Sequence, residues 1–168
     1  QKDTPRFAAR LNAFKIGSET YWPGKNFITT SDLLARAATA GVNAADLNYP
    51  DHFMDDSPAD LLKALGDSGM ILNGIAMRYY TEPGYKLGAF THPNTVVRRA
   101  AIDETKRGLD VLAEMGGNLM TLWMGQDGFD YSFQMDYERA WSNTIDAMIE
   151  VADHNPAIDI ALEYKPNE

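Results

Sequence analysis

Cysteine is absent from this chain of 168 residues. The absence of thiols excludes a disulfide framework, a zinc finger and a cysteine nucleophile, and it leaves the redox compartment undetermined. Basic residues are also scarce, because 15 Lys and Arg stand against 24 Asp and Glu, and the formal net charge is -9. Nucleic acids and anionic membranes bind clustered Lys and Arg, and the sequence has no such cluster, so neither is expected as a partner.

Long apolar runs are missing as well. No stretch approaches the ~18 residues that a membrane-spanning helix needs, and the beginning of the chain lacks the apolar core of a signal peptide. The chain begins with Gln1 rather than Met, which a processed signal peptide or a sequence that starts downstream of its natural beginning would each explain. We expect a cytoplasmic protein, and a processed secreted or periplasmic form is also compatible with Gln1.

The residues that are present have the composition of a folded globular protein. Hydrophobic residues make up 45% of the chain and charged residues 23%, which is the balance found in ordinary soluble domains. A chain of this length buries a substantial core and fits one domain, so a single domain over 1–168 is expected.

Strand and helix signals alternate along the chain. Apolar runs predict strands at 14–19, 42–50, 71–80, 118–125 and 158–165, and helices are predicted at 31–41, 57–69, 94–115 and 137–153. Ser31 and Ser57 are the predicted N-caps of the first two helices, which end at Gly41 and Gly69. In the third helix, a recurrence at three- and four-residue spacing predicts a buried face made of Val97, Ala101, Thr105, Leu109 and Leu112.

This alternation predicts βαβ units and a parallel sheet whose strands are apolar on both faces. Two architectures qualify, namely a doubly wound open sheet and the beginning of an eight-stranded barrel. No glycine-rich phosphate loop follows the first strand, which counts against a nucleotide-binding open sheet and against a nucleotide cofactor. In both architectures a functional site lies at the carboxyl ends of the strands.

Polar and aromatic side chains gather after the four later strands. In chain order they are Asn48, Tyr49, Asp51, His52, Arg78, Tyr79, Tyr80, Trp123, Gln126, Asp127, Asp130, Glu163 and Lys165. Aromatic rings pack on the C–H faces of a polyol, and carboxylates and amides bind its hydroxyl groups. A carboxylate at a strand tip also suits a hard divalent cation.

These residues have structural interpretations too. Glu163 can pair with Lys165 as easily as it binds a metal, since residues two apart on a strand point to the same side. Trp123 is most simply a packing residue, and His52, in a polar turn, is most simply solvated. The other two histidines lie at predicted helix ends, so the three together show no metal-ligand spacing.

The segment ALEYKPNE that ends the sequence resembles the EPKPNEP segment of xylose isomerases. In that family the glutamate binds a divalent metal and the lysine hydrogen-bonds the substrate oxygens, which implies a metal-ligand role for Glu163 and a catalytic role for Lys165. Glu168 closes the motif and is expected to contact the substrate. The stretch from YTEPGYK to EMGGN and the segment TLWMGQDG resemble the family as well, which implies that Tyr80 and Trp123 line the substrate pocket.

One position departs from this resemblance. Xylose isomerases have a ring-opening histidine after the second strand and an aspartate three residues later, where this sequence has Asn48 and Asp51. An amide cannot act as a general base, so Asp51 is assigned a catalytic role and Asn48 a substrate-binding role. His52 is also assigned to substrate binding, although its offset places it on a different side of the turn. The loop QDGFDYSFQMDY is similar to that of the wider xylose-isomerase-like barrels, which include rhamnose-type isomerases, epimerases and C-glycoside deglycosidases.

The resemblance implies an α/β fold, a parallel (β/α)8 TIM barrel, of which 1–168 supplies about the first five β/α units as a single incomplete domain. A divalent ion wants about six oxygen ligands and Glu163 offers one carboxylate. The remaining ligands are therefore expected on the absent strands, and the C-terminal half of the barrel is an expected partner. Family members are commonly dimers or tetramers, which implies a homo-oligomer.

The implied activity is that of a metal-dependent sugar isomerase, which interconverts an aldose and a ketose with Mn²⁺, Mg²⁺, Co²⁺ or Zn²⁺. A metal-dependent lyase or epimerase acting on a keto-sugar is the first alternative. A non-catalytic sugar-binding or assembly subunit is the second. All three take a small sugar as their ligand.

Overall fold

The computed structural model describes residues 5–15, 22–125, 127, 129 and 131–163. Within this part of the chain, five strands form one sheet in the order β1-β2-β3-β4-β5, and every neighbouring pair is parallel. The strands are β1 (Ala8–Arg10), β2 (Ala44–Tyr49), β3 (Ile71–Met77), β4 (Leu119–Leu122) and β5 (Asp159–Leu162). The strands have the same order in the sheet as in the sequence. This is the arrangement of consecutive β/α units, as predicted.

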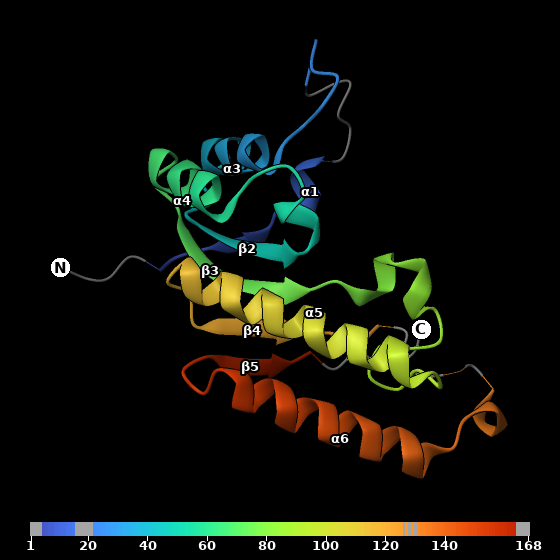
Figure 1. Cartoon of the computed structure of the whole chain (residues 1–168). Coiled ribbons are helices and arrows are strands. Elements are labelled where there is room, and N and C mark those ends of the chain that lie inside the picture. Colours follow the sequence, from blue (N-terminus) through green and yellow to red (C-terminus); the bar gives the residue numbers. More distant parts are fainter. Residues whose placement is uncertain (1–4, 16–21, 126, 128, 130, 164–168) are drawn as a thin grey trace.

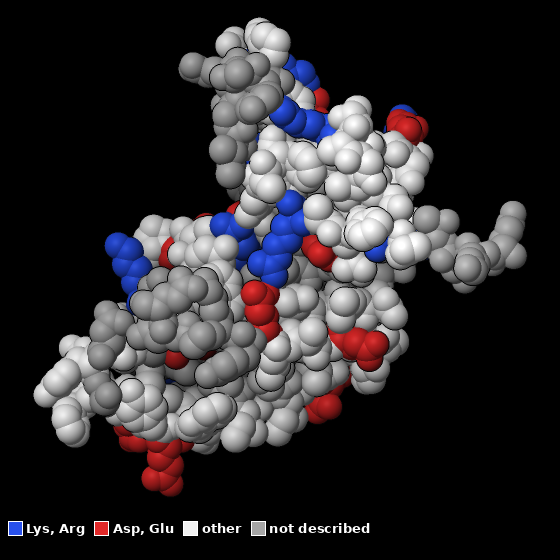
Figure 2. Space-filling view, turned by 180° about the vertical axis from the view of Figure 1, so that it is seen from behind, with Lys and Arg blue, Asp and Glu red and all other residues white. Residues whose placement is uncertain are grey.

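Helices connect the strands. They are α1 (Asn12–Lys15), α3 (Thr30–Thr39), α4 (Pro58–Asp67), α5 (Thr95–Glu114) and α6 (Tyr137–His154), with short 3-10 turns at 51–53, 79–81, 83–85 and 132–134. In Figure 1, α3 and α4 lie together at one end of the sheet, α5 runs across β3 and β4, and α6 lies beside β5. Figure 2 shows the molecule from the opposite side, where acidic and basic side chains meet near the middle of the surface.

The first strand lies earlier than predicted. The prediction was 14–19, but β1 is Ala8–Arg10, with Ala8 opposite Ala44 of β2. Part of the predicted segment belongs to α1, and 16–19 lie outside the described residues. The chain turns directly after β1 because Leu11 enters the core, where it is fully buried, and its carbonyl accepts from the Phe14 amide at 2.9 Å.

The start of α3 also differs from the prediction. Thr29, and not Ser31, is the N-cap, because its hydroxyl accepts from the Asp32 amide while the Asp32 carboxylate accepts from the Thr29 amide. This reciprocal pair satisfies two amides that the helix itself leaves unbonded. The Ser31 hydroxyl instead donates to Asp56 at 2.9 Å. The prediction for α4 is confirmed, since Ser57 caps it.

The longest helix packs closely on the sheet. Four residues of its predicted inward face are fully buried and a fifth is partly buried, namely Ala101, Thr105, Leu109, Leu112 and Val97. At Gly108 an added Cβ would lie 2.9 Å from Met77 Sδ and 3.3 Å from Tyr49 Cδ1. The absence of a side chain at Gly108 therefore lets α5 pack closely on β3 and β4.

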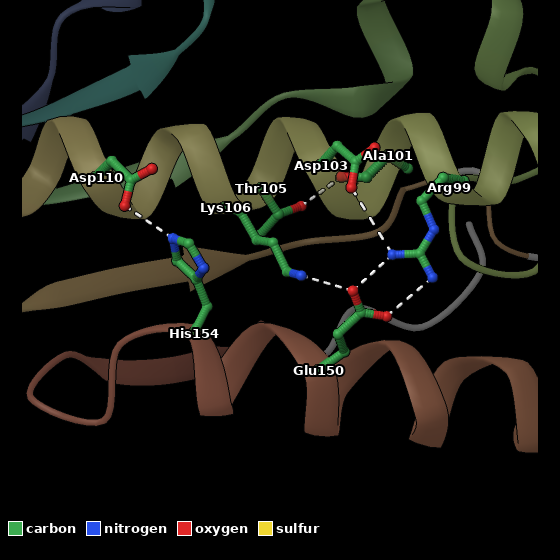
Figure 3. A network of polar contacts seen from close by, with 8 residues as sticks. All are labelled: Arg99, Ala101, Asp103, Thr105, Lys106, Asp110, Glu150 and His154. Carbon is green, nitrogen blue, oxygen red and sulfur yellow. Dashed lines mark hydrogen bonds and ion pairs between the residues drawn. The ribbon is translucent and has the colours of Figure 1, made fainter.

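Charged side chains join α5 to α6 (Figure 3), and the group formed by Arg99, Lys106 and Glu150 is called the α5–α6 clamp below. The Glu150 carboxylate accepts from Arg99 Nη1 at 2.5 Å and Nη2 at 3.0 Å, and from Lys106 Nζ at 2.5 Å. Hydrogen bonds from these two cations lower the pKa of Glu150 to about 2. One turn further on, His154 Nε2 lies 2.7 Å from Asp110 Oδ1.

Burial falls toward the β5 side of the molecule. The expectation of strands buried on both faces holds for most of β2 and for the second half of β3, but three of the four β5 residues are exposed. Leu162 in β5 is 63% exposed. An apolar stripe on α6 is exposed as well, and it consists of Tyr137, Trp141, Ile145 and Ile149. None of the helices in the described residues has the length and hydropathy to span a membrane.

Candidate functional site

A chain of side-chain contacts runs across the carboxyl ends of β2, β3 and β4. The Asp51 carboxylate lies 3.5 Å from Arg78 Nε, and the Arg78 guanidinium lies 4.7 Å from the centre of the Tyr80 ring. The Tyr80 ring in turn meets Trp123 edge-on, with 4.7 Å between ring centres. Parallel strands present their carboxyl ends at one edge, which is why residues from three loops meet here.

The contact between Asp51 and Arg78 is an ion pair at long distance. The Arg78 side chain is 15% exposed, and its Nε has no hydrogen-bond acceptor among the described residues. A buried N–H donor without an acceptor costs free energy. Arg78 was predicted only as a strand-end residue, and its position between Asp51 and Tyr80 was not predicted.

Asn48 and His52 form a separate pair at the end of β2. The His52 Nδ1 accepts from the backbone N–H of Asn48 at 2.9 Å, and the side-chain Nδ2 of Asn48 donates to Asn12 Oδ1 at 3.0 Å. The expectation of a solvated His52 is wrong, because this residue is 6% exposed and its ring accepts from the Asn48 backbone N–H. Burial, with the charges of Arg78 and Lys15, lowers the pKa of His52 to about 4, so it is neutral at pH 7.

Glu163 follows β5 and faces β1. Its Oε2 accepts from Arg10 Nη2 at 2.5 Å, and its side chain is 35% exposed. Arg10 and Glu163 are 153 residues apart in the chain, and the pair was not predicted because nothing in a sequence reports such a distant contact. Lys165 and Glu168 lie outside the described residues.

A pocket of about 440 Å³ opens beside Glu163 and Trp123. It is bounded by the loops after β3 and β4, the first half of α6 and the tip of β5. The lining residues are Thr91, Trp123, Met124, Gly125, Asp127, Met135, Tyr137, Ala140, Trp141, Thr144 and Glu163. Its walls combine aromatic rings with two carboxylates. Burial raises the pKa of one of them, Asp127, to about 6.

The described residues do not make a complete metal site. No group of three His, Cys, Asp or Glu side chains in this part of the chain is arranged to hold an ion. Glu163 contributes one carboxylate, and that carboxylate is paired with Arg10. A hard divalent cation needs about six oxygens, so these residues fit a metal only as one part of a larger set of ligands.

Consecutive parallel β/α units, with aromatic and charged side chains meeting at the carboxyl edge, define this chain as part of a β/α barrel with a polar site at its mouth. Residues 34–168 match a protein family described as the xylose isomerase-like TIM barrel. The chain therefore belongs to the xylose isomerase-like TIM-barrel family, as the terminal motif had implied.

One relative by sequence and two solved structures by fold agree with this family assignment. The chain is 28% identical over 144 residues to a xylose isomerase of Thermus thermophilus, and the match covers 80% of this chain but 37% of that protein. The fold matches a D-psicose 3-epimerase of Clostridium cellulolyticum, solved with D-tagatose, with a TM-score of 0.65 and 16% identity over 94% of this chain and 52% of that one. A D-allulose 3-epimerase of a Methylomonas species, solved with D-allulose, gives a TM-score of 0.61 and 17% identity over 79% of this chain and 44% of that one. The chain thus spans about half the length of these structures or less.

Proposed function

We propose that this chain supplies the N-terminal part of the active site of a metal-dependent sugar isomerase, which interconverts an aldose and a ketose. The observation that carries the proposal is the position of Glu163 at the tip of β5, in the wall of a pocket that also contains Trp123. The 28% identity to a xylose isomerase supports the same activity.

In this proposal the aromatic pair binds the carbon skeleton of the sugar. The rings of Tyr80 and Trp123 offer apolar surface to its C–H groups, and the Arg78 guanidinium, paired with Asp51, supports the Tyr80 ring. Lys165 hydrogen-bonds the oxygens at the reacting carbons, and Glu168 contacts the substrate beside it. Asp51, held near Arg78, is a carboxylate available to accept a proton.

Glu163 is proposed as one ligand of a divalent cation, Mn²⁺, Mg²⁺, Co²⁺ or Zn²⁺. Such a cation polarises the carbonyl and hydroxyl oxygens that it binds. The other ligands come from β/α units beyond the described residues, and Arg10 neutralises the Glu163 carboxylate when the cation does not.

Those further β/α units are also proposed to cover the exposed surface formed by β5 and α6. β5 pairs with β4 on one side, and Leu162 together with the α6 stripe presents exposed apolar side chains. A parallel strand added beside β5, followed by an amphipathic helix against α6, would bury these groups. The assembled barrel is proposed to form a homo-oligomer in the cytoplasm.

A second candidate is a metal-dependent epimerase or lyase that acts on a keto-sugar. It is favoured by the arrangement at the end of β2, where xylose isomerases have the ring-opening histidine. Here Asn48 is 1% exposed and bonded to Asn12, and the Nδ1 of His52 is occupied by the Asn48 amide. Asn48 and His52 are therefore not arranged to open a sugar ring, which suits a substrate that reacts in its open-chain keto form.

The test is the substitution Glu163→Gln in the complete, assembled protein. We expect bound metal, measured by elemental analysis, and turnover to fall together, while Glu114→Gln, at the exposed end of α5, changes neither. A panel of aldoses, ketoses and keto-sugars separates the isomerase from the epimerase or lyase. Saturable sugar binding without turnover or metal would instead indicate a non-catalytic sugar-binding subunit, and unchanged metal and activity in Glu163→Gln would refute the assignment.

A further inference from the structure

Asp127 connects two loops at the mouth of the sheet. Its Oδ1 accepts from the Ala89 amide at 2.5 Å, across 38 residues of sequence. Ala89 and Phe90 are 1% and 0% exposed, so this bond anchors a buried segment of the loop after β3 to the loop after β4. A charged acceptor makes such a bond stronger than one between neutral groups.

The loop after β3 is shaped around this carboxylate. Gly88 has a φ of 100°, and a Cβ added there would lie 2.7 Å from Asp127 Oδ1 and 2.2 Å from Thr91 Oγ1. A residue with a side chain would be strained in this backbone conformation and would push the carboxylate away. The close approach of the loop to Asp127 therefore depends on the glycine.

Burying this carboxylate is costly. Burial raises the pKa of Asp127 to about 6, although the amides of Ala89 and Phe90 and the hydroxyl of Thr91 favour its charged form. Its Oδ2 is buried and has no hydrogen-bond partner among the described residues. A carboxylate buried with one unpaired oxygen contributes little to folding stability. The role argued below for Asp127 is therefore to fix the position of the two loops relative to each other.

The same two loops touch again at the aromatic pair. Trp123 and Gly125 lie just before Asp127 in the chain, and both contact Tyr80: the two rings are 4.7 Å apart, and a Cβ added at Gly125 would lie 3.2 Å from Tyr80 Cβ. The loop after β3 and the loop after β4 are thus joined at two places, by the contact between Tyr80 and Trp123 and by the hydrogen bond between Ala89 and Asp127.

We propose that Asp127 is a positioning residue that holds the Tyr80–Trp123 pair in place by tying Ala89 to the loop after β4. That the pair forms a wall for a sugar rests on the function proposed above, whereas the tie between the loops does not. Asp127 lines the same pocket as Trp123 and Glu163, and in this role it acts through the loops without touching the substrate.

The experiment compares Asp127→Ala and Asp127→Asn with the matched control Asp136→Ala. Asp136 Oδ1 also accepts one backbone amide, that of Arg139 at 3.1 Å, but within its own helix end. Amide hydrogen exchange of residues 86–92 is expected to rise about tenfold in Asp127→Ala, the effect of losing one charge-assisted hydrogen bond. Asp127→Asn keeps an oxygen that can accept from Ala89 and is expected to restore most of the protection, while Asp136→Ala leaves residues 86–92 unchanged.

The position of the aromatic pair is read from Trp123 itself. With Trp22→Phe and Trp141→Phe, the sequence retains Trp123 as its one tryptophan, and acrylamide quenching reports how open its ring is. Asp127→Ala is expected to raise the quenching constant about as much as Tyr80→Ala does. Unchanged quenching in Asp127→Ala, or equal exchange in Asp127→Ala and Asp136→Ala, would overturn the proposal.

Two further measurements keep the test decisive. If Asp127→Ala does not fold, Gly88→Ala disturbs the same contact from the other loop and is expected to give the same local rise in exchange; no rise would count against the proposal. In the assembled protein, D-xylose titration is expected to show a weaker affinity for Asp127→Ala and not for Asp136→Ala. If the unaltered protein binds no D-xylose or keto-sugar, the proposed function fails, and the exchange and quenching results still decide whether Asp127 ties the loops.

Discussion

Arg10 Nη2 and Glu163 Oε2 lie 2.5 Å apart, although Arg10 is in β1 and Glu163 directly follows β5. These two strands are the opposite edges of the sheet in the described residues. Their contact means that the sheet curls until the carboxyl ends of its edges face each other. In a flat sheet of five strands, spaced about 4.8 Å apart, the two side chains would not meet.

Together with the metal-ligand role proposed for Glu163, this pair predicts competition between Arg10 and a cation for the Glu163 carboxylate. In the assembled protein, Arg10→Gln is expected to raise the affinity for Mn²⁺ several-fold, because the carboxylate no longer has to leave a guanidinium before binding. Isothermal titration measures the effect, and Arg6→Gln, at an exposed position before β1, is the control. A lower affinity for Mn²⁺ in Arg10→Gln would mean that Arg10 assists the site.

The buried His52 predicts acid sensitivity. The pKa of His52 is about 4 in the folded protein against 6.5 for the free side chain. Between these two pH values the unfolded chain therefore binds a proton at His52 and the folded chain does not. The contribution of His52 is complete above pH 6.5 and is lost as the pH falls from 6.5 to 4, by up to about 3 kcal/mol. Urea unfolding of His52→Gln should show a flatter dependence on pH over this range, and an unchanged slope in this variant would contradict the assignment of the acid sensitivity to His52.

The α5–α6 clamp predicts a second and more acidic transition. The pKa of Glu150 is lowered to about 2 from 4.5, so its stabilising contribution is present above pH 4.5 and disappears as the pH falls toward 2. The side chain is 35% exposed, and solvent screening limits the loss in Glu150→Gln to about 1 kcal/mol. Thermal unfolding in 1 M salt should bring the unaltered protein close to Glu150→Gln, because the screening length is then about 3 Å. A difference that persists undiminished in salt would point to packing instead of charge.

Two helical glycines predict opposite outcomes. Gly108→Val would place new methyl groups against Met77 and Tyr49, and overpacking of this kind costs about 1–3 kcal/mol. Gly66→Ala, in α4, meets nothing within 4 Å and should stabilise the protein by about 1 kcal/mol, because alanine is the better helix former. Chemical denaturation measures both, and a neutral Gly108→Val would show that the side chains of Met77 and Tyr49, or α5 itself, can move to make room.

The regular elements could be predicted because their signals are local. The buried face of α5 follows from the spacing of Ala101, Leu109 and Leu112, and the Ser57 cap of α4 follows from residues within one turn. β1 was missed because three residues with two alanines carry almost no strand signal, and its place is set by pairing with β2. The N-cap of α3 was misassigned because serine is the better cap by residue type. In the structure Thr29 caps the helix through its reciprocal bonds with Asp32, and the Ser31 hydroxyl donates to Asp56.

The candidate site was predictable only in part. Local order places Tyr80 and Trp123 at strand ends, and the family motif at the end of the sequence drew attention to Glu163. The partners that these residues acquire could not be predicted, since Arg10, Arg78 and Ala89 reach them from loops and strands far away in the sequence. The same applies to His52, whose burial results from packing among elements and not from its polar neighbours in the turn. The roles assigned to Lys165 and Glu168 stay predictions.

The exposed stripe on α6 has a practical consequence for anyone who purifies this chain. Trp141, at 66% exposed, and Ile149, at 56%, lie beside a strand whose Leu162 is 63% exposed. A bare strand with apolar neighbours is a template on which another chain can add its own strand. When it is concentrated, the polypeptide is expected to self-associate and to bind chaperones during expression, and replacing Trp141 and Ile149 with polar residues should reduce this self-association.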